Sequence, residues 1–493
     1  MSVIRDRLAR ASSWLAAAKL MSGVLSAAGT VILARLLVPA DFGIVALAAS
    51  FIAVAASLTE LSLGSALINV EEPEADHLHT VWTLNLARAA FLTAGFCLAA
   101  HPLALLLGDT RLEPVLYALS ASLALTGMIS PRLSLLERDL RFRQAFTLTL
   151  CSTLAGFAVS VALGVMFRSY WALVAGTLAG QVVRVGVSFA VAPYWPKLRL
   201  TRARELWRFS AWLSLSQIAS TLNYRADQLI VGWHLGRAEL GFYTVGGQLA
   251  QLPGREVVAP LTAALFPALS LVRGDADRSR SGYLRAQTLT TAVALPVTML
   301  VALFAHPLVL LLLGPQWVGA VPVIQFVAAA TAFETLGSLV GPLAMAQGQT
   351  KVLFHRDMLK LGLRLPLIVA GLLLGGFPGL LAGRSLAGVL GIFIDMTLVR
   401  TITSLPLGAQ LWANRRCLIA TGVMAVVAVT LQRLVPAPEA TWEQWARLVL
   451  LGGASLGAMV LTTVLLWRRA GFAEGPEREM AELTHSVLKA ARA

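Results

Sequence analysis

Long apolar stretches separated by short polar connections run along almost the whole chain. A helix that crosses a membrane needs about 20 predominantly apolar residues, and the chain offers about fourteen segments of that kind. The predicted spans are 13–37, 42–70, 80–107, 112–135, 144–167, 170–192, 206–235, 239–272, 282–313, 318–346, 352–375, 378–403, 413–434 and 442–468. Such continuous bands differ from the short alternating strands of outer-membrane barrels. The pattern predicts an all-α polytopic protein of an inner or plasma membrane.

Composition agrees with this prediction and adds an orientation. Only 13% of the 493 residues are charged and 57% are hydrophobic, whereas soluble domains are about 25% charged. The net charge of +14 comes from basic residues that cluster in alternate connections, such as 132–143, 197–208 and 273–285. Because Lys and Arg gather on the cytoplasmic side of membrane proteins, we expect both termini to be cytoplasmic. We expect no nucleic-acid partner.

The sequence contains no motif that indicates a metal site or ATP-driven transport. The three cysteines lie far apart, and the pair His77 and His79 has no further Cys or His at ligand spacing. No GxxxxGK[ST] stretch occurs, which argues against an ATP-driven pump within the chain. We expect no metal, no cofactor and no catalytic residue.

Short motifs that contain Gly and Pro occur twice along the chain, in the same order. His101-Pro-Leu-Ala-Leu-Leu-Leu-Gly108 resembles His306-Pro-Leu-Val-Leu-Leu-Leu-Leu-Gly314, and Ala40-Asp-Phe-Gly43 resembles Ala238-Glu-Leu-Gly241. Pro131, after Gly127, is matched by Pro342, after Gly337, so the offset between the copies grows from 198 through 205 to 211 along the chain. We predict two six-helix lobes, 1–200 and 201–405, followed by helices 13 and 14 in 406–470 and a cytoplasmic tail, 471–493. Parallel repeats of this kind are related by an axis along the membrane normal, with a central cavity between the lobes.

Polar and charged residues inside the predicted spans are the candidates for lining this cavity. An ionisable group at bilayer depth costs about 2.5–3.5 kcal/mol on insertion scales, so it usually faces a cavity or a partner. We predict a cationic substrate site formed by Lys19, Arg88, Arg225 and Arg255. We predict a polar lining formed by Ser22, Ser26, Gln217, Asn223, Asp227, Gln248 and Gln251. Two acids, Glu60 and Glu334, either neutralise an arginine or carry a coupling proton or sodium ion.

A cavity with several cations prefers an anion, because like charges in a low dielectric repel until a negative group joins them. A pyrophosphate with a polar body meets this requirement. If the substrate were linked to a lipid, its tail would need an opening between helices, which a two-lobed bundle can provide.

Several stretches are similar to one family. Asn223-Tyr-Arg-Ala-Asp-Gln-Leu-Ile-Val-Gly232, Leu265-Phe-Pro-Ala-Leu-Ser270 and Arg35-Leu-Leu-Val-Pro-Ala-Asp-Phe-Gly43 resemble bacterial O-antigen and exopolysaccharide flippases of the multidrug/oligosaccharidyl-lipid/polysaccharide exporter superfamily. The resemblance implies translocation of an undecaprenyl-pyrophosphate-linked oligosaccharide between leaflets of the inner membrane, by alternating access, for exopolysaccharide or lipopolysaccharide synthesis. It implies a cavity lined by helices 1, 2, 7 and 8. The lipid-linked oligosaccharide and the bilayer are the expected partners, and a polysaccharide polymerase and a proton or sodium ion are candidates.

Three alternatives stay open at this stage. A cation-coupled multidrug antiporter of the same superfamily typically has twelve helices and an acid in the first, where this chain has Lys19. A flippase for lipid-linked peptidoglycan precursors shares the predicted plan and the cationic cavity. A membrane enzyme would need a substantial external loop, and the longest external connection here is about 435–443.

Overall fold

The computed structural model describes residues 2–60, 63–64, 67, 73–139, 142–201, 203–271, 276–347, 349–436, 438, 440–471 and 475–478. Every regular element among these residues is a helix, which confirms the all-α prediction. The chain divides into two compact units, Met1–Val245 and Gly246–Ala493. The predicted lobe boundaries at 200 and 405 stay a prediction.

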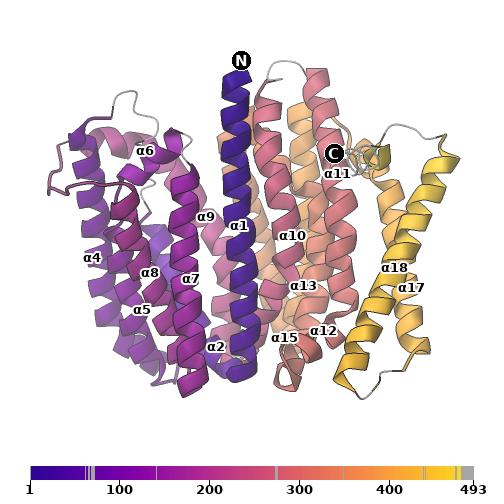
Figure 1. Ribbon diagram of the computed structural model, residues 1–493, viewed down its shortest axis with the longest axis horizontal. Helices are drawn as coiled ribbons and strands as arrows, with labels where there is room; N and C mark the ends of the chain where they lie inside the picture. The colour runs from indigo at the N-terminus through magenta and orange to yellow at the C-terminus, as the bar shows by residue number, and fades with distance from the viewer. Residues whose placement is uncertain are drawn as a thin grey trace, which may run out of the picture. The chain divides into compact units, whose positions relative to one another are not determined.

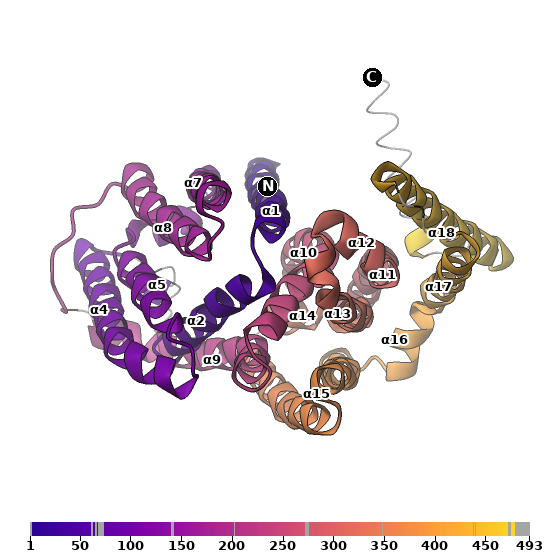
Figure 2. The same cartoon turned by 90° about the horizontal axis from the view of Figure 1, so that it is seen from below.

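The first unit is a bundle of long helices. Its elements are α1 (Ser2–Leu36), α2 (Pro39–Leu58), α4 (Ala75–Leu106), α5 (Leu112–Gly127), α6 (Arg132–Arg138), α7 (Phe142–Phe167), α8 (Trp171–Val191), α9 (Ala203–His234) and the start of α10 (Arg237–Leu271). Helix α7 packs along α8 and α1, α4 packs along α5, and α2 packs along α9 (Figures 1 and 2). Helix α9 therefore joins the first unit through α2.

The second unit continues from α10. Its elements are α11 (Ala276–Leu303), α12 (Ala305–Leu312), η1 (Pro315–Ala320), α13 (Val321–Glu334), η2 (Thr335–Gly337), α14 (Val340–Ala346), α15 (Thr350–Thr403), α16 (Leu407–Ala413), α17 (Arg415–Leu434) and α18 (Thr441–Arg469). Its core includes the fully buried Tyr283 of α11, which packs among Leu339, Leu343 and Val399. Helix α17 packs on α11 and α18 through apolar contacts around Phe304 and Ala428.

The lipid environment explains the surfaces of both units. Large apolar side chains are strongly exposed on the long helices, including Leu98 at 82% and Leu374 at 90%. Such patches are rare on soluble monomers but are expected where a helix faces hydrocarbon. Within the described residues, ten helical stretches are long and apolar enough to cross a membrane. The chain is a multi-pass membrane protein, and the total of about fourteen spans stays a prediction.

Helix boundaries follow glycine and proline. The segment predicted as 112–135 breaks after Gly127, which packs against Ala89 and the Asn85 carbonyl, and the chain turns before Pro131. The two spans predicted as 352–375 and 378–403 belong to α15, which bends sharply where Gly376 takes φ +58° and ψ −139°. A residue with a β-carbon adopts that conformation only at a high cost.

The repeated stretch that ends in Gly108 and Gly314 ends on a glycine with a positive φ in both copies. Each glycine follows the last turn of an apolar helix and has a positive φ, +65° and +101° respectively. Glycine adopts a positive φ without the steric cost that a β-carbon brings. The resemblance between the two stretches therefore extends beyond leucine content to backbone geometry.

Candidate functional site

A cavity of about 610 Å³ opens between α2 and α9 in the first unit. This volume is within the range of about 300–1,000 Å³ typical of small-molecule sites. The lining is mostly polar, and it consists of Ala53, Ala56, Ser57, Glu60, Gly64, Gln217, Ser220, Thr221, Tyr224 and Arg225. The side chains of Gln217 and Tyr224 are exposed, so the cavity is open to its surroundings.

The lining follows from helical periodicity on each side. Residues 217, 220, 221, 224 and 225 recur at three- and four-residue steps, so they share one face of α9. Residues 53, 56, 57 and 60 do the same on α2 and the turn after it. The α9 face is polar and the α2 face is built mainly of small residues, which leaves room between the helices. The predicted lining residue Gln217 and the predicted cation Arg225 thus face a cavity.

Arg225 supplies a guanidinium group to this cavity. Its Nη1 donates to Gln228 Oε1 at 2.8 Å, and the same oxygen accepts from Ser50 Oγ of α2 at 2.7 Å. Ser50 is fully buried. Because Gln228 is a neutral amide, this hydrogen bond holds the guanidinium without compensating its positive charge. Arg225 is therefore oriented and remains able to attract an anion.

Glu60 and Arg88 form an ion pair at the edge of the same cavity. Arg88 Nη2 lies 2.8 Å from Glu60 Oε2, and Arg88 also donates to the carbonyl oxygen of Ala56 and to Thr59 Oγ1. These contacts fasten α4 to the end of α2. Of the two roles considered for Glu60, this geometry matches neutralisation of an arginine, and it leaves Arg225 as the cation that lines the cavity among the described residues.

Other predicted site residues are not among the described residues that line this cavity. Lys19 and Ser26 are exposed on α1, where Ser22 Oγ donates to the Lys19 carbonyl. Asn223 bonds to the Ala219 carbonyl one turn back. On α10, Gln248 is exposed and Gln251 is partly buried. The side chain of Arg255 lies outside the described residues.

Asp227 is not among the residues that line the cavity. Its side chain is buried and accepts a hydrogen bond from the hydroxyl of Tyr243 on α10. Arg225 and Asp227 are about 200° apart around the helix axis, so they meet different neighbours. Asp227 joins α9 to the first turns of α10.

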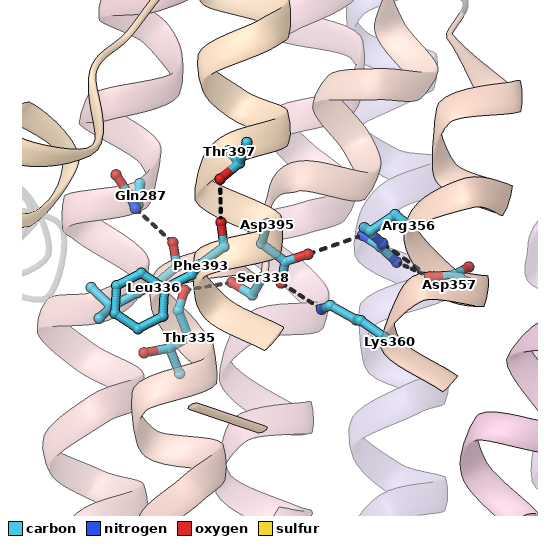
Figure 3. A network of polar contacts seen from close by, with 10 residues as sticks. All are labelled: Gln287, Thr335, Leu336, Ser338, Arg356, Asp357, Lys360, Phe393, Asp395 and Thr397. Carbon is cyan, nitrogen blue, oxygen red and sulfur yellow. Dashed lines mark hydrogen bonds and ion pairs between the residues drawn. The ribbon is translucent and has the colours of Figure 1, made fainter. Parts of the chain in front are cut away.

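A second cluster of charges lies in the second unit, on the two arms of α15 (Figure 3). Lys360 Nζ lies 2.6 Å from Asp395 Oδ2, and Arg356 Nη1 lies 3.8 Å from Asp395 Oδ1. Asp357 accepts two hydrogen bonds from Arg356. The Asp395 side chain is 8% exposed. This cluster holds the arms of the α15 hairpin together, and glycines do so nearer the bend, where Gly371 meets the Gly379 carbonyl.

Glu334 ends α13 and lies against α15. Its carboxylate occupies the space that a side chain at Gly388 would need. Its side chain is exposed. Glu334 is not among the residues that line the cavity of the first unit.

A third cluster of charges lies in two turns outside the spans of the first unit. Asp109 Oδ2 lies 3.1 Å from Arg111 Nη2 and 3.4 Å from Arg237 Nε. Burial raises the pKa of the Asp109 carboxyl, but the hydrogen bonds from Arg111 and the two positive charges outweigh burial and leave this pKa below its usual range. Arg237 also donates to the carbonyl oxygens of Gly232 and Leu107. These contacts join the α4–α5 turn to the α9–α10 turn.

Sequence reasoning missed three residues of these clusters. Gln228 and Ser50 orient Arg225, but their pairing depends on which helices are neighbours. Their only sequence signal is that both are polar within apolar spans. The pattern of basic residues assigns Lys360 to a cytoplasmic connection, because Lys351 and Arg356 precede it. In the structure it lies on α15 opposite Asp395.

The described residues contain no group of three or more His, Cys, Asp or Glu side chains that could hold a metal ion. The described cavity offers a guanidinium, hydroxyls and amides. This set can bind an anionic group and the hydroxyls of a polar body through hydrogen bonds.

Comparisons with known proteins assign the chain to a family. The model of a family described as polysaccharide biosynthesis protein matches residues 32–322. The succinoglycan biosynthesis transport protein ExoT of Rhizobium meliloti is 26% identical over 439 residues, which cover 88% of each chain. The lipopolysaccharide biosynthesis protein WzxC of Escherichia coli is 24% identical over 82% of this chain and 80% of its own. Lipid II flippase MurJ, in an inward closed conformation, shares the fold with a TM-score of 0.72 at 14% identity, covering 92% of this chain and 98% of its own.

Proposed function

Because the chain belongs to the polysaccharide biosynthesis protein family, we propose that it is a flippase that moves a lipid-linked oligosaccharide across the inner membrane. The substrate moves from the cytoplasmic to the periplasmic leaflet, for exopolysaccharide or lipopolysaccharide synthesis. The relatives ExoT and WzxC carry names from these two processes, and ExoT is named a transport protein. The chain acts as a transporter rather than an enzyme, by alternating access.

The observation that carries the proposal is the polar cavity with the guanidinium of Arg225 in its wall. A lipid-linked oligosaccharide presents a pyrophosphate next to its first sugar. The pyrophosphate would pair with Arg225, and sugar hydroxyls would exchange hydrogen bonds with Gln217, Ser220 and Thr221. A cavity of this size holds the anionic group and adjoining sugar, and the rest of a longer glycan extends through the open side.

Residues outside the described cavity keep their predicted roles in this proposal. Lys19, on the polar stripe of α1 with Ser22 and Ser26, and Arg255 of α10 add positive charge along the path of the anion. Of the two acids predicted for coupling, Glu334 carries the proton or sodium ion in this proposal, because Glu60 neutralises Arg88. Both termini are cytoplasmic, as the basic connections predict. A polysaccharide polymerase consumes the flipped intermediate in the periplasm.

Deletion of the gene in its native host tests the proposal. We expect the lipid-linked oligosaccharide to accumulate in the cytoplasmic leaflet and surface polysaccharide to disappear. Re-expression of wild type should restore the polymer, and Arg225→Ala at matched membrane levels should not. Arg184→Ala removes an exposed arginine of α8 and is the matched control. Unchanged polymer with increased drug sensitivity would contradict the flippase and favour the antiporter, and accumulation of peptidoglycan precursors would favour the precursor flippase.

A further inference from the structure

The first turns of α2 and α10 contact each other through two glycines. A β-carbon at Gly43 would lie 1.8 Å from the carbonyl oxygen of Arg237, and a β-carbon at Gly241 would lie 1.9 Å from the carbonyl oxygen of Pro39. No side chain fits within such distances. In each case the hydrogen that glycine carries in place of a β-carbon points at a backbone carbonyl, which is the arrangement of a Cα–H···O contact.

These two contacts are copies of each other under the internal repeat. Adding 198 to Pro39 gives Arg237, and adding 198 to Gly43 gives Gly241. The contact between Gly43 and Arg237 therefore maps onto the contact between Gly241 and Pro39. Here the same contact occurs twice, with the roles of the two repeat copies exchanged. Contacts related in this way lie about a local two-fold axis. We call the pair of turns Pro39–Gly43 and Arg237–Gly241 the reciprocal glycine contact.

The position of this contact relates it to the substrate path. Gly43 is 10 to 17 residues before the part of α2 that lines the cavity, a distance of about 15–25 Å along a helix. The basic-residue pattern places the α9–α10 turn on the outer side of the membrane, opposite to the cytoplasmic termini. This orientation places the contact on the outer side of the cavity.

The surrounding residues hold the contact closed. Arg237 is fixed by the carbonyl oxygens of Gly232 and Leu107 and by Asp109. Its side chain is 11% exposed. Beside the glycines, Ile44 and Leu240 are fully buried. The two turns are therefore held together both by the backbone contacts at the glycines and by the side chain of Arg237.

We propose that the reciprocal glycine contact closes the outer end of the transport path and that its two turns separate when substrate leaves toward the periplasm. This inference extends the transport function proposed above by naming the closing element. Glycine is required at both positions because only the absence of a β-carbon lets the helix ends meet. A side chain at either position keeps the turns apart and favours the outward-open arrangement.

Cysteine accessibility tests the proposal without any glycan. The reporter is Ile44→Cys in a chain whose Cys97, Cys151 and Cys417 are replaced by serine, labelled on spheroplasts with a membrane-impermeant maleimide. Overpacking of a close contact shifts an equilibrium about 5- to 150-fold, so Gly43→Ala and Gly241→Ala should each raise the labelling rate by that factor.

The double variant should label no faster than the faster single variant, because one added side chain already separates the turns. Gly247→Ala is the matched control, since a β-carbon at Gly247 of α10 meets no neighbouring atom within 4 Å. Labelling rates of both glycine variants equal to that of the control would overturn the proposal.

Arg237→Lys is a second variant that adds no atoms to the contact. A lysine ammonium cannot hold Gly232, Leu107 and Asp109 together as the guanidinium fork does. We expect faster labelling of Ile44→Cys in this variant too. If the glycine variants do not reach the membrane, the Arg237→Lys variant decides: labelling at the wild-type rate overturns the proposal. Because the assay contains no lipid-linked sugar, its outcome is independent of whether the proposed substrate is correct.

Discussion

The Lys360–Asp395 pair should be energetically coupled, and a double-mutant cycle measures the coupling. Asp395 is 8% exposed and Lys360 30% exposed, and their charged atoms lie 2.6 Å apart. Removing one partner of a buried pair costs about 3–5 kcal/mol, because the other charge is left uncompensated. The expected values here are smaller, since Lys360 is partly solvated and Arg356 stays within 3.8 Å of Asp395.

We expect Lys360→Met to lower the free energy of unfolding by about 2–3 kcal/mol and Asp395→Leu by about 1–2 kcal/mol. The double variant should lose about 1 kcal/mol or less, because an apolar pair of similar volume needs no charge compensation. The coupling energy is then about 2 kcal/mol or more.

Reversible unfolding in mixed micelles gives these free energies. The control is Arg400→Met, which removes an exposed cation from the same helix and should change stability by less than about 0.5 kcal/mol. A coupling energy below about 0.5 kcal/mol would contradict this prediction, because it would show that the hairpin does not depend on this pair.

Three further predictions follow from other contacts. Glu60→Gln should tighten binding of a pyrophosphate lipid, because it removes the negative charge that compensates Arg88 at the cavity edge; titration calorimetry measures this, and weaker binding would contradict it. Asp109 has a lowered pKa in the folded protein, so its contribution to stability is complete above its unfolded pKa of about 3.9 and is lost as pH falls through the folded pKa. Asp109→Asn should therefore flatten the fall in melting temperature at acid pH. An unchanged profile of melting temperature against pH would contradict this prediction. Gly371→Val should prevent closure of the α15 hairpin, since a β-carbon would lie 2.2 Å from the Gly379 carbonyl oxygen; membrane levels equal to those of Gly375→Val, whose β-carbon meets no neighbour, would contradict this.

The sequence predicted the helices well because apolar length is a local property. Each predicted span contains helix among the residues that the structure describes, although turns interrupt several spans, such as 112–135 after Gly127. Boundaries such as Gly127 and the bend at Gly376 were harder to place, because they depend on close approaches between segments. The polar face of α9 was predictable from its composition, and Gln217 and Arg225 of that face line the cavity.

Pairings between helices could not be predicted from the sequence. Arg88 and Glu60 were separate candidates, and only packing of α4 beside the end of α2 joins them. The role of Gln228 depends on Ser50 in a helix far away in sequence. The repeat predicted two equivalent turns, but it could not predict that Gly43 and Gly241 meet each other's copies. Such contacts are properties of the tertiary structure.

Reconstitution of the purified protein tests whether this cavity carries a lipid-linked oligosaccharide between leaflets. Liposomes would carry an undecaprenyl-pyrophosphate-linked oligosaccharide, and access of an external glycosidase would report its movement between leaflets. We expect movement with wild type and Arg184→Ala, and loss of movement with Arg225→Ala. Absence of movement with wild type, or equal movement with Arg225→Ala, would contradict the claim that this cavity carries the substrate.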